Sequence, residues 1–259
     1  GQCRVRRRLG VAVIIAGAAA AAYVFSTAPQ GAVTATNGRA IQMGDSGSMF
    51  MVTLDLQNDG APVSINNVAS PAGAHASLMN PLEGSAIVVP GTDTVQLAMD
   101  GVHIMLHVPP GTFAKGTFHS LALGLSDGSE VLARVLHPDT SGGMAKMNHN
   151  MEDGIVVSPP PEIALMGRPQ ISANGFEIEI TTQNFEFVLI DDSAPHVAGQ
   201  GHAHIYLNGV KLGRLYEERF SIGALLPGEY VLTVVLNSND HRPYMSDGAP
   251  TSLTYRFSI

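Results

Sequence analysis

Short apolar runs, each followed by a turn, are the feature that most restricts how this chain can fold. Many runs alternate apolar with polar side chains, as in FMVTLDLQN at 50–58 and FEIEITTQ at 176–183. The chain's 28 Gly and 16 Pro supply the turns between them. Alternation with period two is typical of half-buried strands, whereas an amphipathic helix needs a period near 3.6. We therefore expect an all-β protein.

The predicted strands fall into two sets, separated by residues 139–161, which lack apolar periodicity and end in three prolines. Each set contains enough strands for one β-sandwich of the immunoglobulin-like type. We expect residues 41–138 to form a first domain and residues 162–259 a second. The segment 139–161 is then a linker, and it contains several methionines and one histidine.

The N-terminus has the pattern of a membrane-directed segment. Four arginines within residues 4–8 precede an uncharged apolar stretch at 9–25, which is close to the lower length limit for a spanning helix. We expect residues 1–25 to be a signal or a retained transmembrane helix, followed by a tether at 26–40. By the positive-inside rule the arginines stay in the cytoplasm. The remainder is then periplasmic, anchored in the inner membrane if the helix is retained.

Charge and cysteine content exclude several classes of function. The four N-terminal arginines belong to a total of 14 basic residues, so ten remain against 22 acidic residues. Nucleic-acid binding needs a basic face and is not expected. The single cysteine excludes an internal disulfide and a cysteine-based zinc site. Because hydrolase, phosphate-loop and zinc-protease motifs are missing from the sequence, we expect a binding protein and no enzyme.

One predicted strand, VHIMLHV at 102–108, carries an unusual polar face. Its aliphatic residues occupy one side, and His103, Met105 and His107 share the other, because side chains alternate along a strand. An ordinary half-buried strand explains the histidines but gives no reason for a thioether between them. Thioether and imidazole together are a ligand set that selects Cu(I).

Four short motifs occur in order around this strand: ASPAGAH at 69–75, MNPLEG at 79–84, a Pro-Gly turn at 90–91 and GVHIML at 101–106. With them, the segment from about residue 45 to 138 resembles the PCu(A)C family of extracytoplasmic copper chaperones. The signature of that family is an upstream His and Met followed by His-x-Met.

The resemblance implies a cupredoxin-like sandwich that holds Cu(I) through His75, Met79, His103 and Met105. Met79 matches the family's methionine, and His103 with Met105 matches its His-x-Met; His75 lies closer to Met79 than the family's first histidine does. The resemblance also implies delivery of Cu(I) to a membrane copper enzyme such as a haem-copper cytochrome oxidase. The alternative is an anchored accessory or assembly subunit of a respiratory membrane complex, with a structural role.

A second histidine pattern lies in the second strand set. GHAHIYLNG at 201–209 places His202 and His204 on one strand face, and His241 follows after the next long apolar run. If these residues bind metal, with His196 as a further candidate, an all-imidazole set favours Cu(II) or Zn(II). Structural histidines that bond turn carbonyls are the alternative.

Overall fold

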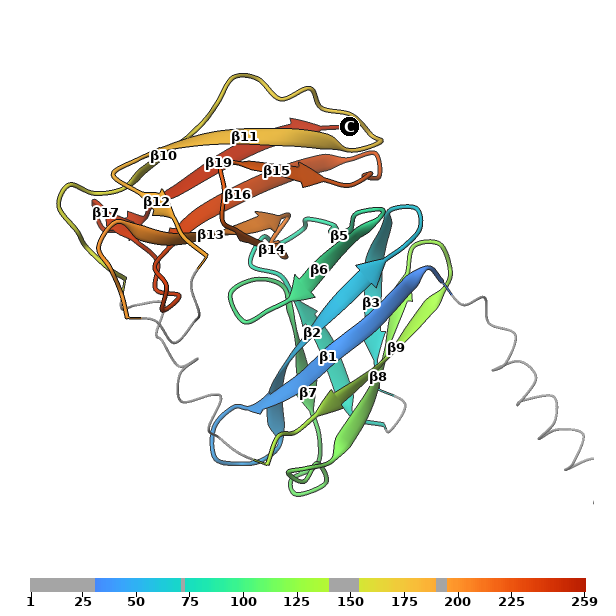
Figure 1. Cartoon of the computed structure of the whole chain (residues 1–259). Coiled ribbons are helices and arrows are strands. Elements are labelled where there is room, and N and C mark those ends of the chain that lie inside the picture. Colours follow the sequence, from blue (N-terminus) through green and yellow to red (C-terminus); the bar gives the residue numbers. More distant parts are fainter. Residues whose placement is uncertain (1–30, 71–72, 140–153, 190–194) are drawn as a thin grey trace, which may run out of the picture.

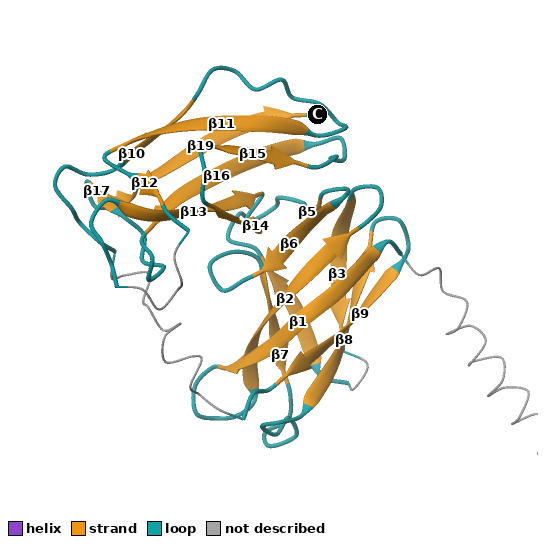
Figure 2. Ribbon diagram, in the orientation of Figure 1, coloured by secondary structure: helices purple, strands orange, loops and turns teal. Residues whose placement is uncertain are grey.

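The computed structural model describes residues 31–70, 73–139, 154–189 and 195–259. These residues form an all-β structure without an α-helix in the described ranges (Figure 2). Accordingly, no helix long and apolar enough to span a bilayer is found among them. The membrane segment predicted at 1–25 and most of the predicted linker, including its methionines and histidine, lie outside the described residues.

The N-terminal half, residues 31–139, is the group of strands coloured blue to green in Figure 1. It contains one hydrophobic core. Strand β2 pairs with β1 along one edge and with β7 and then β6 along the other. Strand β4 pairs with β7, while β9, β8, β3 and β5 follow one another in hydrogen-bonded order. The strands are β1 (Val33–Gln42), β2 (Met49–Asn58), β3 (Val63–Ala69), β4 (His75–Met79), β5 (Ile87–Val89), β6 (Asp93–Leu97), β7 (His103–His107), β8 (Phe118–Leu125) and β9 (Glu130–Leu136).

Strand β7 shows how the sequence pattern positions a functional face. Ile104 and Leu106 are fully buried in the core of the N-terminal half. His103 and Met105 are half-buried and His107 is exposed, because they point away from that core. The alternation that was read from the sequence is therefore confirmed in this strand.

The first strand starts earlier than expected. The predicted tether at 26–40 overlaps β1, which begins at Val33 and pairs antiparallel with β2. Val33 and Ala40 are the buried residues of this strand, and a register shift interrupts its pairing with β2. Because so few of its side chains enter the core, β1 has no clear alternation in sequence.

The C-terminal half, residues 154–259, has its own hydrophobic core. Strand β13 pairs with β14 on one edge and β16 on the other, and β19 follows β16. Strands β10, β11 and β15 form a separate three-stranded sheet. The strands are β10 (Glu162–Leu165), β11 (Phe176–Gln183), β12 (Glu186–Phe187), β13 (Gln200–Leu207), β14 (Val210–Leu215), β15 (Arg219–Ile222), β16 (Glu229–Asn237), β17 (Met245–Ser246), β18 (Ala249–Pro250) and β19 (Ser252–Ser258).

The two halves are joined by backbone pairing and by a reciprocal exchange of core residues. Strand β14 pairs with β6 at Lys211 and Gln96, so one hydrogen-bonded network of strands crosses the junction. Val88, from β5, is buried in the C-terminal core, whereas Val210, from β14, is buried in the N-terminal core. Each core therefore includes a side chain supplied by the other half.

This exchange predicts that Val88→Ala destabilises the C-terminal half even though residue 88 belongs to the N-terminal half. Val88 is 1% exposed, and truncating such a side chain costs roughly 1.5–3 kcal/mol of unfolding free energy. Hydrogen exchange of the β16 amides, measured with and without urea, reports the loss. Val156→Ala is the matched control, because Val156 is 80% exposed. If the β16 amides kept the same protection in the Val88 variant, Val88 would not stabilise the C-terminal core.

Candidate functional site

Strands β4 and β7 bring three of the four predicted copper ligands together. Met79 lies directly opposite His103 in the antiparallel register, and Met105 follows two residues along β7 on the same face. Directly opposed residues have Cβ atoms about 4.5–5.5 Å apart. Met79 is 45% exposed, and the other two side chains are half-buried. An incoming ligand can therefore reach this group of donors.

His75, the fourth predicted ligand, lies at the opposite end of β4. It pairs with His107, and the two ring centroids are 6.3 Å apart. Four residues along a strand span roughly 13 Å, so the backbone of His75 is well separated from that of Met79. The structure groups His75 with His107, which the sequence pattern had placed on the polar strand face without a role.

Strand β2 adds two thioethers that the sequence analysis did not single out. Met51 lies opposite Met105, and Met49 lies opposite His107. Both methionines are half-buried and alternate with buried core residues of β2. The signal was present in the sequence, because Met49 and Met51 occupy the non-core positions of an alternating run. We call these seven residues the Met/His face: Met49, Met51, His75, Met79, His103, Met105 and His107.

The ring of His103 is oriented by the loop that precedes it. Its Nδ1 lies 3.0 Å from the carbonyl oxygen of Gly101. A carbonyl oxygen only accepts hydrogen bonds, so Nδ1 carries the proton and Nε2 keeps its lone pair. This is the arrangement in which a histidine binds a metal through one nitrogen and is held in place through the other.

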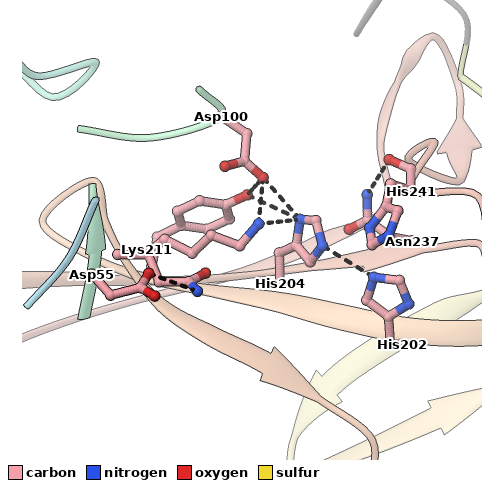
Figure 3. A network of polar contacts seen from close by, with 9 residues as sticks. Asp55, Asp100, His202, His204, Lys211, Asn237 and His241 are labelled. Atoms are coloured by element: carbon pink, nitrogen blue, oxygen red, sulfur yellow. Dashed lines mark hydrogen bonds and ion pairs between the residues drawn. The ribbon is translucent and has the colours of Figure 1, made fainter. Parts of the chain in front are cut away.

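The second predicted set of histidines forms a compact cluster (Figure 3). His202 and His204 project from the same face of β13 and are 3% and 4% exposed. One nitrogen each of His202, His204 and His241 lie within 4.8 Å of one another. Three imidazoles in this arrangement can hold a metal ion. We call these three residues the His triad.

His241 is presented by a tightly bonded turn after β16. The Asp240 carboxylate accepts hydrogen bonds from Ser238 Oγ and from Arg242, whose Nη2 is 2.7 Å away. The Asn237 side chain donates to the His241 carbonyl oxygen at 3.2 Å. His196, the further candidate, is outside the metal-binding group, and its ring centroid lies 6.0 Å from that of Tyr244.

A carboxylate from the N-terminal half contacts the His triad. Asp100 Oδ2 lies 3.0 Å from His204 Nδ1 and 2.7 Å from Lys211 Nζ, and it accepts a hydrogen bond of 2.8 Å from the Tyr206 hydroxyl (Figure 3). In the sequence, Asp100-Gly101 has only the pattern of a turn. No local pattern reveals this role, because Asp100 and Lys211 are 111 residues apart in the chain.

Burial and charge together set the protonation states here. Burial alone would raise the pKa of Asp100, but hydrogen bonds and charge attraction from His204 and Lys211 hold that pKa well below its usual range. Burial lowers the pKa of His202 to about 2. Burial also lowers the pKa of His204, to about 4, although the hydrogen bond and the negative charge of Asp100 act to raise it. Both imidazoles are therefore neutral at neutral pH, the form that binds metal.

Comparisons with known proteins give partial structural likenesses. No protein-family model matches the chain, and no curated protein matches it. The copper-bound PCuAC domain from PmoF2 is 15% identical, covers 43% of this chain and 96% of its own, and has a TM-score of 0.38. The apo PCuAC domain from PmoF1 is 14% identical, with coverages of 43% and 97% and a TM-score of 0.38. The Pseudomonas aeruginosa CupB2 chaperone is 9% identical, covers 81% of this chain and 92% of its own, and has a TM-score of 0.23.

The lowered pKa values of His202 and His204 predict a pH dependence of stability in the metal-free protein. The unfolded histidines gain protons below their ordinary pKa of 6.5, while the folded ones stay neutral until about pH 4 or lower. The unfolding free energy should therefore fall as the pH drops from about 6.5 to about 4, by up to about 1.4 kcal/mol per pH unit for each histidine.

Urea unfolding across this pH range measures the effect. In the double variant His202→Gln with His204→Gln, the unfolding free energy should fall clearly less with decreasing pH. The exposed control His75→Gln should show the same pH dependence as the parent. Asp100 contributes below this window, because its ordinary pKa is 3.8. An equal slope in the parent and the double variant would show that other groups take up the protons.

Proposed function

We propose that the N-terminal half binds Cu(I) through Met79, His103 and Met105. The observation that carries this proposal is the register of β4 and β7, in which Met79 faces His103 and Met105 follows on the same side. Two thioethers and one imidazole favour Cu(I), because soft ligands select the soft cuprous ion. The hydrogen bond from His103 Nδ1 to Gly101 leaves Nε2 to bind the metal.

The surroundings of these three residues favour transfer of copper over permanent storage. Met79 is largely accessible, and Met51 lies opposite Met105. An acceptor's ligand can approach while the donor ligands still hold the ion, and neighbouring thioethers offer further soft contacts along the Met/His face. We infer a binding and delivery role without catalysis. In this proposal His75 belongs with His107 and is not needed for the primary copper site.

The cellular part of the proposal follows from the N-terminal sequence and the PCu(A)C resemblance. The body of the protein would lie outside the cytoplasm, behind an inner-membrane segment, and deliver Cu(I) to a membrane copper enzyme such as a haem-copper cytochrome oxidase. Copper content of the oxidase in cells lacking this chain, compared with cells carrying Met105→Leu, tests delivery. An oxidase that lacks copper in both strains supports it, whereas full copper loading with the Met105 variant favours a structural accessory role.

The ligand assignment predicts that Met105→Leu lowers Cu(I) affinity at least about tenfold, because it keeps apolar bulk and removes the sulfur donor. Met79→Leu should act similarly, whereas His75→Ala should change the affinity less than threefold. Competition with a chromophoric Cu(I) chelator gives these values, and the unfolding midpoint shows that each variant remains folded. Met166→Leu is the matched control, because Met166 is an exposed methionine of the C-terminal half. A loss with His75→Ala as large as that with Met79→Leu would overturn the assignment.

A further inference from the structure

The contacts of His204 define where its lone pair points. Its Nδ1 lies 3.0 Å from Asp100 Oδ2, 3.1 Å from Lys211 Nζ and 3.3 Å from the Tyr206 hydroxyl. Lys211 and Tyr206 both also bond to that Asp100 oxygen, so we assign the Nδ1 proton to a hydrogen bond to the carboxylate, which can only accept. The Nε2 lone pair of His204 is therefore directed into the His triad, 3.0 Å from Nε2 of His202. A histidine that donates to a carboxylate through one nitrogen and offers the other to a shared centre has the geometry of a metal ligand with an outer carboxylate partner.

The donor set restricts which ion fits the His triad. All three donors are imidazole nitrogens, and two of the three side chains are almost fully buried. The Met/His face supplies thioethers, and the triad itself contains none. Borderline divalent cations such as Zn(II) and Cu(II) bind three-imidazole sites, whereas Cu(I) gains more from thioethers.

The outer carboxylate is itself fixed by other contacts. Lys211, which is buried, and Tyr206 both bond to the same Asp100 oxygen that faces His204. All three partners come from β13 and β14 of the C-terminal half, while Asp100 comes from the loop at 98–102 between β6 and β7 of the N-terminal half. His204 therefore has its carboxylate partner only when this loop lies against β13 and β14.

The same loop also holds His103. Gly101, the next residue after Asp100, accepts the hydrogen bond from His103 Nδ1. The loop is closed by the bond from Ala98 N to Val102 O at 2.8 Å and is tied to the C-terminal half by the bond from Val102 N to Gly209 O at 2.9 Å. A Cβ atom on Gly101 would lie 2.6 Å from Gly209 O, so the backbones approach closely there. Asp100 and Gly101 are consecutive in the chain. Asp100 thus orients His204 in the His triad, and Gly101 orients His103 on the Met/His face.

We propose that the His triad binds one divalent, imidazole-preferring cation with Asp100 as its outer carboxylate, and that the bound cation fixes the loop at 98–102 and so orients His103 for Cu(I). The second part rests on the proposed function, whereas the first stands independently. Ligation of His204 polarises its ring and strengthens the bond from Nδ1 to Asp100. A loop held more firmly lowers the ordering cost of binding Cu(I) at His103. The two ions should therefore bind with positive cooperativity.

A zinc titration of the full chain tests the first part. Zn(II) is the probe, because it has no redox chemistry, and competition with a chromophoric zinc chelator gives stoichiometry and affinity. The parent should bind one zinc ion more than the double variant His202→Gln with His204→Gln. Asp100→Asn should weaken that ion about 10–100-fold, the usual effect of removing an outer partner of a metal-bound histidine. Equal stoichiometry in the parent and the double variant, or unchanged affinity in the Asp100 variant, would overturn the site.

Two further variants separate metal positioning from folding. Asp100→Asn with Lys211→Met removes the buried charge that the single change leaves unpaired, and it should show the same loss of zinc affinity in a folded protein. Asp45→Asn changes an exposed acid in the loop after β1 and should bind zinc as the parent does. If the paired variant regained full zinc affinity, Asp100 would have a structural role alone, and the assignment would fail.

Cu(I) titration with and without one equivalent of Zn(II) tests the coupling. Zinc should tighten Cu(I) binding at least about fivefold in the parent and leave it unchanged in the double histidine variant. Equal Cu(I) affinity with and without bound zinc would overturn the coupling alone. A chain that binds zinc at the His triad but takes up no Cu(I) in either condition would overturn the proposed function and leave the divalent site standing.

Discussion

The half-buried carboxylate of Asp100 makes the interactions on which the junction between the two halves depends. It is the partner of a buried lysine, and it also meets the Tyr206 hydroxyl and one imidazole. A buried ammonium group without its counter-charge is strongly destabilising. The lysine on β14 therefore requires that the loop at 98–102 lie in this position. The same lysine is the residue at which β14 pairs with β6 of the N-terminal half.

The two groups of candidate metal ligands differ in access as well as in chemistry. The Met/His face points outward from β2, β7 and β4, with residues that are half-buried or exposed. The His triad is covered, with two imidazoles only 3% and 4% exposed. Accessible soft donors suit an ion that is handed on, whereas a covered imidazole set suits an ion that stays in place.

The alternation of apolar and polar residues in the sequence was sufficient to predict most strands. It also predicted residues of both the Met/His face and the His triad. It placed His103, Met105 and His107 on one face of β7, and His202 and His204 on one face of β13. It missed β1, which buries few side chains, and the short strands β4, β10, β15, β17 and β18. It also could not give the register of β4 against β7, which decides that His75 faces His107. The role of Asp100 could not be predicted from local sequence either, because its partners belong to the other half of the chain.

The exchange of Val88 and Val210 between the cores affects how the chain can be divided. A fragment that ends after Asp139 would contain an empty space in its core where Val210 packs, and the Val88 side chain would be exposed to water. A fragment that begins at Gly154 would have the complementary defect. Although the strands of each half form a core of their own, the halves are packed as parts of one molecule. Excising either one alters the interior of both.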